Sequence, residues 1–562
     1  MRKRWQIASP LTPDAERELA AFPFPLRQIL FNRGYATEAE ARAFLQPERS
    51  FPDPGYPLDV EAAVERILYA RRQHQKVIVY GDYDVDGVTA TALLLEVLQR
   101  LDIAAESYIP NRFDEGYGLN VDALRELKEG GTDLVISVDC GIRSLEEAEF
   151  ARRIGLDLII TDHHHPGEAL PQALAVINPK RADDPYPEKQ LAGVGLAWKL
   201  AQALIERTAK EPDFSLLELV ALGTVADLAP LNGENRLLVR GGLKALRQTR
   251  RPGLLSLAKL AGLNLATTTA TDIGFILGPR LNAAGRLESA LDALHLLLTQ
   301  DVFQAGLFAQ RLESQNRQRQ ALTRAIQAEA EKLALERAGE GEVPPLLFAA
   351  HPEFNIGVVG LAAARLSERH YRPAIVARQD AETTRGSCRS IPEFHITEAL
   401  DQCADLLLHY GGHAAAAGFT LLNRNLPEFI ERISWLAEQA LAGKDLRPTL
   451  WADVEVPLSQ MGPEVWKQLQ YLQPTGYGNP EATFVSRDVR VRQVRAVGAE
   501  GHHLKLTLED ERGVLWDAIG FRLGEMQTQI LPGDRVDILY TLEINEYNGR
   551  RTLQINLKDV VK

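Results

Sequence analysis

The chain has 562 residues, of which 45% are hydrophobic and 25% charged, and its formal net charge is −13. This length is too great for one hydrophobic core and predicts three or four domains of an ordinary globular protein. No apolar run reaches the roughly 18 residues of a membrane span, and no apolar segment follows the basic N-terminus, so we expect neither a membrane nor an exported protein. The acidic charge argues only weakly against nucleic acid, because binding depends on where basic side chains gather.

Five segments are predicted along the chain. They are a helical lead-in (1–55), an α/β domain with a mostly parallel sheet (56–300), a connecting helix (301–340), a second α/β domain (341–447) and a C-terminal antiparallel β-barrel of the OB type (448–562). A Pro-rich stretch ends the lead-in, and Gly and Pro residues after the connecting helix mark the other clear boundary.

The first α/β domain shows short apolar runs at 76–80, 133–138 and 156–160, with helical patterns at 87–101 and 144–154 between them. Alternating strand and helix predicts a parallel sheet covered by helices on both faces. A polar residue follows each run: Asp82 and Asp84, then Asp139, then Asp162 and the histidines after it. Since ligands bind at the carboxyl ends of such strands, we expect these loops to converge.

Carboxylates stand at every second position in Asp82, Asp84 and Asp86, just before Gly87. An EF-hand calcium loop has the same start, but it needs a Glu at its twelfth position, where this chain has Leu93. Closely spaced carboxylates repel one another and favour a bound divalent cation. A polar turn after the strand is an equally good interpretation of this motif alone.

The run from Asp162 through His163, His164 and His165 is more informative, because three adjacent histidines are rarely all core residues. Imidazole in an oxygen-rich site shifts the expected metal from Mg²⁺ toward Mn²⁺. Asp227 would attract no notice by itself. Cys140 has no second cysteine nearby, and the three cysteines of the chain suit a reducing cytoplasm, where we expect the protein to reside.

The later segments are predicted with less detail. Residues 302–337 have the spacing of one long helix, and runs at 346–350 and 373–377 predict strands. Gly411 and Gly412 suggest a tight turn before His413, and the Ala run that follows favours helix. From about 485 onward, period-two alternation predicts short strands, and Asn548–Gly549 is a hairpin signal between two of them.

The order of the motifs DYDVDG, SVDCG, TDHHHPG and GTVADLAPL resembles the DHH phosphoesterase superfamily. Three later segments, GPRLNAAGR, GSCRSI and GGHAAAAG, extend this similarity, and the last resembles the DHHA1 motif. With the OB-like tail, residues 45–562 resemble the RecJ family of single-strand-specific 5′→3′ exonucleases. Each motif is moderately specific, whereas their order is highly specific.

The resemblance implies a site with two Mn²⁺ or Mg²⁺ ions. Its expected ligands are Asp82, Asp84, Asp139, His163 and Asp227. Asp86 and Asp162 would orient the loop and His163, and His164 would face the scissile phosphate. His165 stands where an apolar residue is expected, so which histidines act at the site stays open.

The resemblance also implies residues that hold the DNA strand. Arg389 and Ser390 are expected to bind the 5′ phosphate with help from Arg112, and Tyr117 would either stack on a base or pack on a helix. The further expected contacts, in Gly-rich segments that can approach phosphate, are Arg280, Asn282, Arg286 and His413. Single-strand-binding protein and a RecQ-type helicase are the implied partners of a monomer.

The expected activity is hydrolysis of single-stranded DNA from its 5′ end to mononucleotides, in DNA repair and recombination. One alternative is a DHH enzyme that acts on oligoribonucleotides or cyclic dinucleotides, which would need no OB-type domain. Another is a non-catalytic replication factor that binds single strands, which would have lost metal carboxylates. All expected carboxylates are present here.

Overall fold

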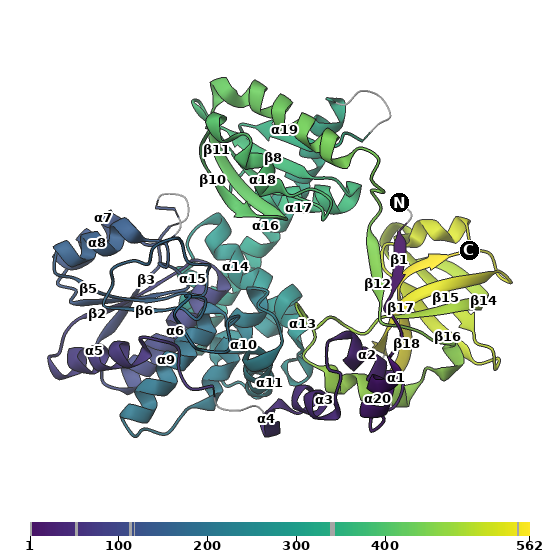
Figure 1. The fold of residues 1–562 in the computed structure, drawn as a ribbon, viewed down its shortest axis with the longest axis horizontal. Helices are drawn as coiled ribbons and strands as arrows, with labels where there is room; N and C mark the ends of the chain where they lie inside the picture. The colour runs from purple at the N-terminus through teal and green to yellow at the C-terminus, as the bar shows by residue number, and fades with distance from the viewer. Residues whose placement is uncertain (1–2, 51–53, 112–114, 117, 338–342, 548–549) are drawn as a thin grey trace. The chain divides into compact units, whose positions relative to one another are not determined.

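The computed structural model describes residues 3–50, 54–111, 115–116, 118–337, 343–547 and 550–562 (Figure 1). Two compact units are present. The larger unit comprises Trp5–Pro279, Ala293–Gly306 and Thr449–Lys562, and the smaller unit comprises Met1–Arg4, Arg280–Asp292 and Leu307–Pro448. Within the described ranges, no helix combines the length and apolarity needed to cross a membrane.

The larger unit contains the expected parallel sheet, with strand order β3-β2-β4-β5-β6. Its strands are β2 (Val77–Gly81), β3 (Ala105–Tyr108), β4 (Leu134–Val138), β5 (Asp157–Thr161) and β6 (Ala175–Ile177). β2 and β4 are buried along their whole length, which explains why they appear in the sequence as continuous apolar runs. The chain moves from β2 to β3 on one side and continues with β4 on the other, so the sheet has a switch point between β2 and β4.

Helices cover both faces of this sheet. One apolar core joins the sheet to α7 (Val121–Glu129) and α8 (Leu145–Arg153). On the other face, α6 (Val85–Arg100) lies against β2 and packs on α9 (Gly193–Arg207) and α10 (Leu217–Ala226), while α5 (Val60–Arg72) lies beside β6. The predicted helices at 87–101 and 144–154 are therefore α6 and α8.

A helical region follows α10. Its elements are α11 (Gly233–Leu246), α12 (Pro252–Ala261), α13 (Ala270–Asp272), a π-helical turn (Ile273–Leu277), α14 (Gly278–Leu287) and α15 (Leu291–Leu298). The predicted long helix is present as α16 (Val302–Glu336), which has 35 residues.

The smaller unit contains a five-stranded sheet of order β10-β11-β9-β8-β7. Its strands are β7 (Leu347–His351), β8 (Ala374–Gln379), β9 (Thr383–Arg389), β10 (Leu407–His413) and β11 (Ala416–Leu422), and its helices include α17 (Val359–His370), α18 (Ile396–Asp401) and α19 (Leu426–Leu441). The helix expected for the Ala run is wrong, because β10 and β11 form an antiparallel hairpin there. Ala417, Phe419 and Leu421 alternate toward the core, and this period-two pattern outweighs the helix propensity of alanine.

The C-terminal strands form the expected closed barrel, with order β13-β14-β15-β16-β18-β17 and a further β14–β17 pairing. The strands are β13 (Val454–Glu455), β14 (Phe484–Val497), β15 (His503–Glu509), β16 (Leu515–Gly520), β17 (Arg535–Tyr547) and β18 (Arg550–Val561), and α20 (Pro463–Leu469) lies between the first two. β17 and β18 pair antiparallel on either side of Asn548–Gly549, a dipeptide outside the described residues.

The N-terminal segment departs from a purely helical lead-in. It begins with β1 (Arg4–Ile7), which pairs with β12 (Thr449–Ala452), and continues with α1 (Pro13–Glu18), α2 (Leu26–Asn32), α3 (Glu38–Leu45) and α4 (Pro47–Ser50). Leu19, Ile29 and Phe44 share one core with barrel residues such as Phe484 and Leu506. The first helices therefore pack on the last domain of the chain (Figure 1).

Candidate active site

The loop between β2 and α6 supplies two carboxylates of an acidic cluster. Asp84 is the N-cap of α6, where its Oδ1 accepts hydrogen bonds from Asp86 N at 2.8 Å and Gly87 N at 3.2 Å. Asp82 is 4% exposed, and one oxygen each from Asp82, Asp84 and Asp139 lies within 4.8 Å of the other two. The first two expected ligands therefore face the third.

Asp139 directly follows β4 in a left-handed backbone conformation, with φ +62°. Its N–H donates to Thr161 O at 3.0 Å, and this bond joins the carboxyl ends of β4 and β5. A non-glycine residue at positive φ is uncommon, although Asp and Asn tolerate it better than most residues. This conformation lets the side chain of Asp139, which is 1% exposed, turn into the cluster.

The loop after β5 separates the three histidines. Nε2 of His163 lies 3.0 Å from Asp139 Oδ1 and 3.6 Å from Asp227 Oδ2, without a hydrogen-bond partner among the described residues. His164 instead places Nδ1 2.7 Å from Oδ1 of Asp162. His165 is exposed, and its carbonyl accepts from Arg143 Nε at 2.9 Å.

Asp162 makes its hydrogen bonds to the loop and to His164, and none to His163 among the described residues. Its Oδ1 binds the backbone N–H and the ring of His164, and its Oδ2 accepts from Ile142 N at 2.9 Å. The carboxylate therefore joins the β4 and β5 loops and holds His164. His163 belongs to two groups of potential metal ligands, one with Asp139 and His164 and one with Asp86 and Asp227.

Asp227 completes the cluster from the end of α10. It is the C-cap residue of this helix, and its N–H donates to Gly223 O at 2.9 Å. One oxygen of Asp227 lies within 4.8 Å of ligand atoms from Asp86 and His163. Nothing in the sequence alone links Asp227 to the sheet. The packing of α10 on α6 brings its side chain there.

Asp86 has a structural role that the sequence did not reveal. Its two oxygens accept hydrogen bonds from Gly193 N at 2.6 Å and Val194 N at 2.8 Å, at the start of α9. The side chain of Ala192, the N-cap residue, makes no capping bond, so Asp86 serves as the cap from another helix. The carboxylate fixes the first turn of α9 against the acidic cluster.

The electrostatic state of the cluster follows from burial and crowding. Burial raises the pKa of Asp139 well above its usual value, and the neighbouring carboxylates add to this effect. For Asp227, burial and the charge of Asp84 raise the pKa to about 7. Burial and His164 lower the pKa of His163 to about 3, so its ring is neutral at neutral pH and suited to bind a cation.

The pKa of His164 is shifted in the opposite direction from that of His163. Burial by itself would lower its pKa, but the hydrogen bond and charge of Asp162 outweigh this and hold the pKa above the ordinary value. The same pairing keeps the pKa of Asp162 low, although burial opposes its ionisation. The side chain of His164 is 45% exposed, so this imidazole, whose protonated form Asp162 favours, is open to solvent.

Several residues of the site were missed in the sequence. Asn178 is fully buried, and its Nδ2 donates to His164 O at 2.9 Å. Lys180 lies two residues later, where burial lowers the pKa of its ammonium group and the charges of Asp227 and Asp162 oppose this shift. Both residues come directly after β6, whose three residues are too few to give a strand pattern. Polar residues after a strand were the signal that could have found them.

Gly193 permits the close approach of α9 to the cluster. A Cβ atom at this position would lie 2.7 Å from Asp139 Cβ and 2.9 Å from its Oδ1. We therefore expect Gly193→Ala to displace Asp139 and lower the catalytic rate by about 10²-fold while the protein stays folded. Gly195→Ala is the matched control, because its Cβ would meet Leu191 at an ordinary 3.5 Å. Rates of product release together with circular dichroism test this, and equal rates for both variants would contradict it.

Three expected DNA contacts lie on a helix of the smaller unit. Arg280, Asn282 and Arg286, the contacts expected in the Gly-rich segment, belong to α14. Nε of Arg280 donates to Glu313 Oε2 at 2.7 Å, and Nη1 of Arg286 donates to Gly357 O at 3.4 Å. Arg280 is thus held in an ion pair, which makes it less available to a phosphate than we expected.

Arg389, Ser390 and His413 lie together in the smaller unit. Arg389 on β9 and His413 on β10 both pair with Ala416 of the intervening strand β11. Nη1 of Arg389 donates to Ser387 Oγ at 3.2 Å and to Cys388 O at 2.7 Å, and no carboxylate forms an ion pair with it in the described part of the chain. Ser390 Oγ donates to Phe394 O at 2.6 Å. The other two expected contacts, Arg112 and Tyr117, lie outside the described residues.

Family models match three parts of the chain: the DHH family N-terminal domain over residues 76–224, the DHHA1 domain over 344–439 and the RecJ OB domain over 452–559. The parallel sheet with its acid–histidine cluster and the first two of these matches define a DHH-type phosphoesterase. The single-stranded-DNA-specific exonuclease RecJ of Bacillus subtilis strain 168 is 40% identical over 564 residues, or 99% of this chain and 71% of that protein. The chain belongs to the RecJ family.

Other relatives agree with this assignment. The protein of the same name from Escherichia coli K12 is 37% identical, with 96% of both chains covered. A crystal structure of RecJ from Thermus thermophilus in complex with Mn²⁺ superposes with a TM-score of 0.85 at 31% identity, and it covers all of this chain and 79% of that one. A Mg²⁺ complex of RecJ from that organism gives a TM-score of 0.79 at 28% identity.

Proposed function

We propose that the protein is an exonuclease that hydrolyses single-stranded DNA from the 5′ end and releases mononucleotides. The observation that carries this proposal is the convergence of buried carboxylates and a neutral histidine at the carboxyl edge of the parallel sheet, in a chain of this family. A complete cluster argues against a non-catalytic strand-binding factor. The closed C-terminal barrel, a fold that often binds single strands, argues against a purely small-molecule phosphodiesterase.

The residues present suit two divalent cations. The oxygen-rich cluster with one imidazole fits Mn²⁺ or Mg²⁺, and the buried Nε2 of His163 has no hydrogen-bond partner among the described residues. The proposed ligands are Asp82, Asp84, Asp139, His163 and Asp227. When bound, such cations supply a water-derived nucleophile at neutral pH and stabilise charge on the phosphate oxygens.

The protein's own groups then have distinct tasks. Asp84 holds its position through the N-terminus of α6, so that the carboxylate that caps this helix would also hold a cation. Asp86 fixes α9, and Asp162 favours the charged form of His164. His164 is partly exposed, and we propose that it donates from Nε2 to an oxygen of the scissile phosphate.

The proposal is tested with single-stranded and duplex DNA labelled at the 5′ or the 3′ end. We expect Mn²⁺-dependent release of a labelled mononucleotide at the earliest times from the 5′-labelled single strand only. Asp139→Asn should remove this activity, and Asp122→Ala is the matched control, because that side chain is 85% exposed on α7. Early release of the 3′ label, or equal digestion of duplex DNA, would refute the assignment.

Arg389 is proposed to bind the 5′ phosphate. It has no acidic partner among the described residues, its half-buried guanidinium lies at the end of β9, and Ser390 follows it. We expect Arg389→Ala to weaken the use of 5′-phosphorylated strands by about 10- to 100-fold, through the Michaelis constant more than the turnover number. Activity on strands with a 5′ hydroxyl should fall by a smaller factor. Arg385→Ala, four residues earlier on the same strand, is the control, and equal losses on both substrates would contradict the role.

Single-strand-binding protein and a RecQ-type helicase remain the proposed partners, because an enzyme of this kind needs unwound DNA. Three buried free cysteines are consistent with the proposed cytoplasmic location.

A further inference from the structure

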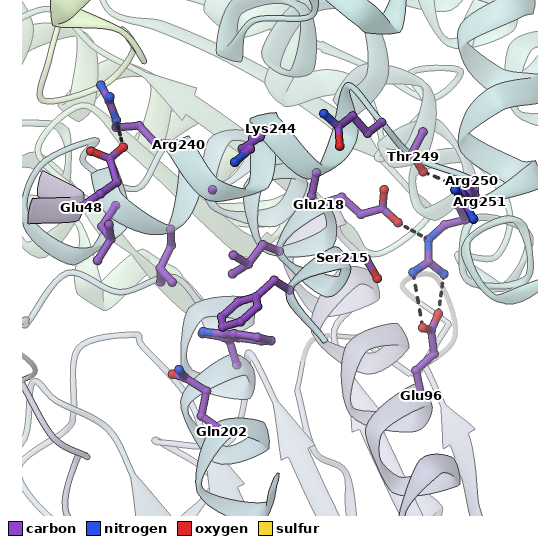
Figure 2. A pocket seen from close by; sticks show the side chains of 18 of the residues that line it. Glu48, Glu96, Gln202, Ser215, Glu218, Arg240, Lys244, Thr249, Arg250 and Arg251 are labelled. Atoms are coloured by element: carbon purple, nitrogen blue, oxygen red, sulfur yellow. Dashed lines mark hydrogen bonds and ion pairs between the residues drawn. The ribbon is translucent and has the colours of Figure 1, made fainter. Parts of the chain in front are cut away.

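The larger unit contains a cavity of about 1190 Å³ that shares no residue with the acid–histidine cluster (Figure 2). Side chains from α4, α6, α9, α10 and α11 line it, together with those of a short 3₁₀ turn (Phe214–Leu216) and of the loop before α12. Ligand pockets usually measure about 300–1,000 Å³ and combine apolar walls with a few polar groups. This cavity is therefore large enough for a small organic ligand and some water.

One wall of the cavity is aromatic. Trp198 on α9 and Phe214 have ring centroids 6.4 Å apart and ring planes inclined by 50°. Phe214 is 60% exposed although it is a large apolar side chain, whereas Trp198 is buried behind it. Leu237 and Leu238 of α11 add aliphatic surface. A flat ring that covers Phe214 would remove this apolar area from water.

The charged groups of the cavity fall into two sets, those in ion pairs and those without one among the described residues. The first set includes Arg100, which pairs with Glu96 at 3.8 Å and with Asp213. Arg251 is bound by Glu96 and by Glu218, the latter at 2.9 Å, and Arg240 binds Glu48 at 2.5 Å, as the dashed lines in Figure 2 show. The charges of these acidic side chains are therefore neutralised by the arginine side chains that bind them.

Lys244 and Arg250 form the second set. Both are exposed and line the cavity, and neither makes an ion pair within the described residues. The cavity thus carries an excess of positive charge in a protein whose net charge is −13. Such a local reversal of sign favours an anionic ligand over a cationic or neutral one.

We propose that this cavity binds a nucleoside 5′-monophosphate outside the catalytic cluster. The phosphate would interact with Lys244 and Arg250, and the base would cover Phe214. The side-chain amides of Gln202 and Gln248 offer donors and acceptors for the edge of a base. An inorganic anion would leave the aromatic wall unused, and an uncharged ring would leave the two cations unused. The choice of a monophosphate rests on the proposed function, because mononucleotides are the product of that reaction.

The test is equilibrium dialysis of the full-length protein with a radiolabelled deoxynucleoside 5′-monophosphate in EDTA. Chelation keeps the catalytic carboxylates free of cations, so they repel the phosphate and do not contribute binding. We expect saturable binding to one site, weakened at least about 10-fold by the double variant Lys244→Glu/Arg250→Glu. Lys259→Glu is the matched control, because this exposed lysine of α12 does not line the cavity.

Two competitors separate the parts of the ligand. Inorganic phosphate and the unphosphorylated deoxynucleoside should each displace the nucleotide, but only at concentrations well above that of the nucleotide itself. Phe214→Ala should weaken the nucleotide and the nucleoside and leave phosphate competition unchanged. Circular dichroism verifies that each variant is folded.

Unchanged affinity in the double variant, or no saturable binding to the parent protein, would overturn the proposal. Binding of an acidic peptide with no binding of nucleotide would do the same and assign the cavity to a protein partner. Failure here is distinguishable from failure of the proposed function. If the protein degrades DNA but binds no nucleotide in EDTA, only the proposed nucleotide site is refuted. If it binds nucleotide but leaves DNA intact, only the exonuclease assignment is refuted.

Discussion

Asp139→Asn is expected to lower exonuclease activity by at least about 10³-fold, because one lost cation ligand removes several kcal/mol of transition-state stabilisation. The same change should raise the melting temperature of the metal-free protein by roughly 2–8 °C. Asp139 is buried among carboxylates, so an uncharged amide relieves repulsion that a bound cation or bound protons otherwise offset. Asn is preferred to Ala here because Asn also tolerates the positive φ of this residue.

The stability of the metal-free protein is expected to fall as the pH rises. Burial and neighbouring charges raise the pKa of Asp139, and that of Asp227 to about 7, so the folded metal-free protein binds more protons than the unfolded chain. Stability from this source is present at low pH and is lost as the pH rises from the unfolded value of about 4 through the folded value near 7. Calorimetry in EDTA between pH 5 and 8 tests this. The variant should show a smaller fall than the parent, and Mn²⁺ should stabilise the parent much more than the variant.

Asp122→Ala serves as the control for both measurements, because its exposed carboxylate on α7 does not face the cluster. If Asp139→Asn destabilises the metal-free protein at pH 8, repulsion between the buried carboxylates does not reduce the stability of the parent. If it retains full activity, Asp139 is not a ligand.

Arg236→Met is expected to destabilise the larger unit by about 2–6 kcal/mol, because each of two carbonyls, those of Phe44 and Tyr471, loses its donor at about 1–3 kcal/mol. The carbonyls of Leu472, Gln473 and Pro474 keep a second donor from Asn479 or Arg240. Arg236 lies on α11, is 1% exposed, and has no carboxylate among its hydrogen-bond partners in the described part of the chain. Its guanidinium donates to five backbone carbonyl oxygens, those of Phe44, Tyr471, Leu472, Gln473 and Pro474, at 2.9–3.3 Å.

This guanidinium also stabilises the arrangement of distant segments of the chain. It lies 4.0 Å from the ring centroid of Phe44 in α3, and its other partners precede the barrel strand β14. Burial lowers the pKa of Arg236 to about 9, a sign of how little water reaches the group. We therefore expect its loss to expose the connection between α11 and the barrel to proteolysis, with cleavage near residues 470–480.

Arg240→Met, one helical turn later, is the matched control. Arg240 donates to a single carbonyl, that of Gln473, and otherwise pairs with the half-exposed Glu48, so we expect a loss below about 1 kcal/mol. Differential scanning calorimetry and limited chymotrypsin digestion measure both effects, because Tyr471 and Tyr477 offer cleavage sites in this segment. Similar stability of the two variants would show that the buried carbonyls find other donors or water.

The sequence by itself determined the chemical identity of the site. The strands before Asp82, Asp139 and Asp162 appear as apolar runs because buried parallel strands are apolar on both faces. The carboxyl ends of parallel strands meet at one edge, so convergence of these loops could be predicted without coordinates. The order of the motifs supplied the remaining expected ligands, His163 and Asp227.

The tertiary structure decided which of the consecutive histidines faces which group. Neighbouring residues in a loop point in different directions, and local sequence does not determine those directions. The structure directs His163 toward Asp139 and Asp227, pairs His164 with Asp162, and leaves His165 exposed. The role of Asp86 as a cap of α9 is likewise a contact across 107 positions of sequence.

Other features also depended on contacts that are remote in sequence. The Ala-rich run is a strand because its alternate residues face the core of the smaller unit, and burial outweighs a helix propensity of less than about 1 kcal/mol per residue. The N-terminal helices pack on the C-terminal barrel, and Arg236 finds its carbonyl partners 192 positions before it and 236 positions after it. Periodicity and motif order report local structure and chemistry, whereas these long-range partners exist only once the chain has folded.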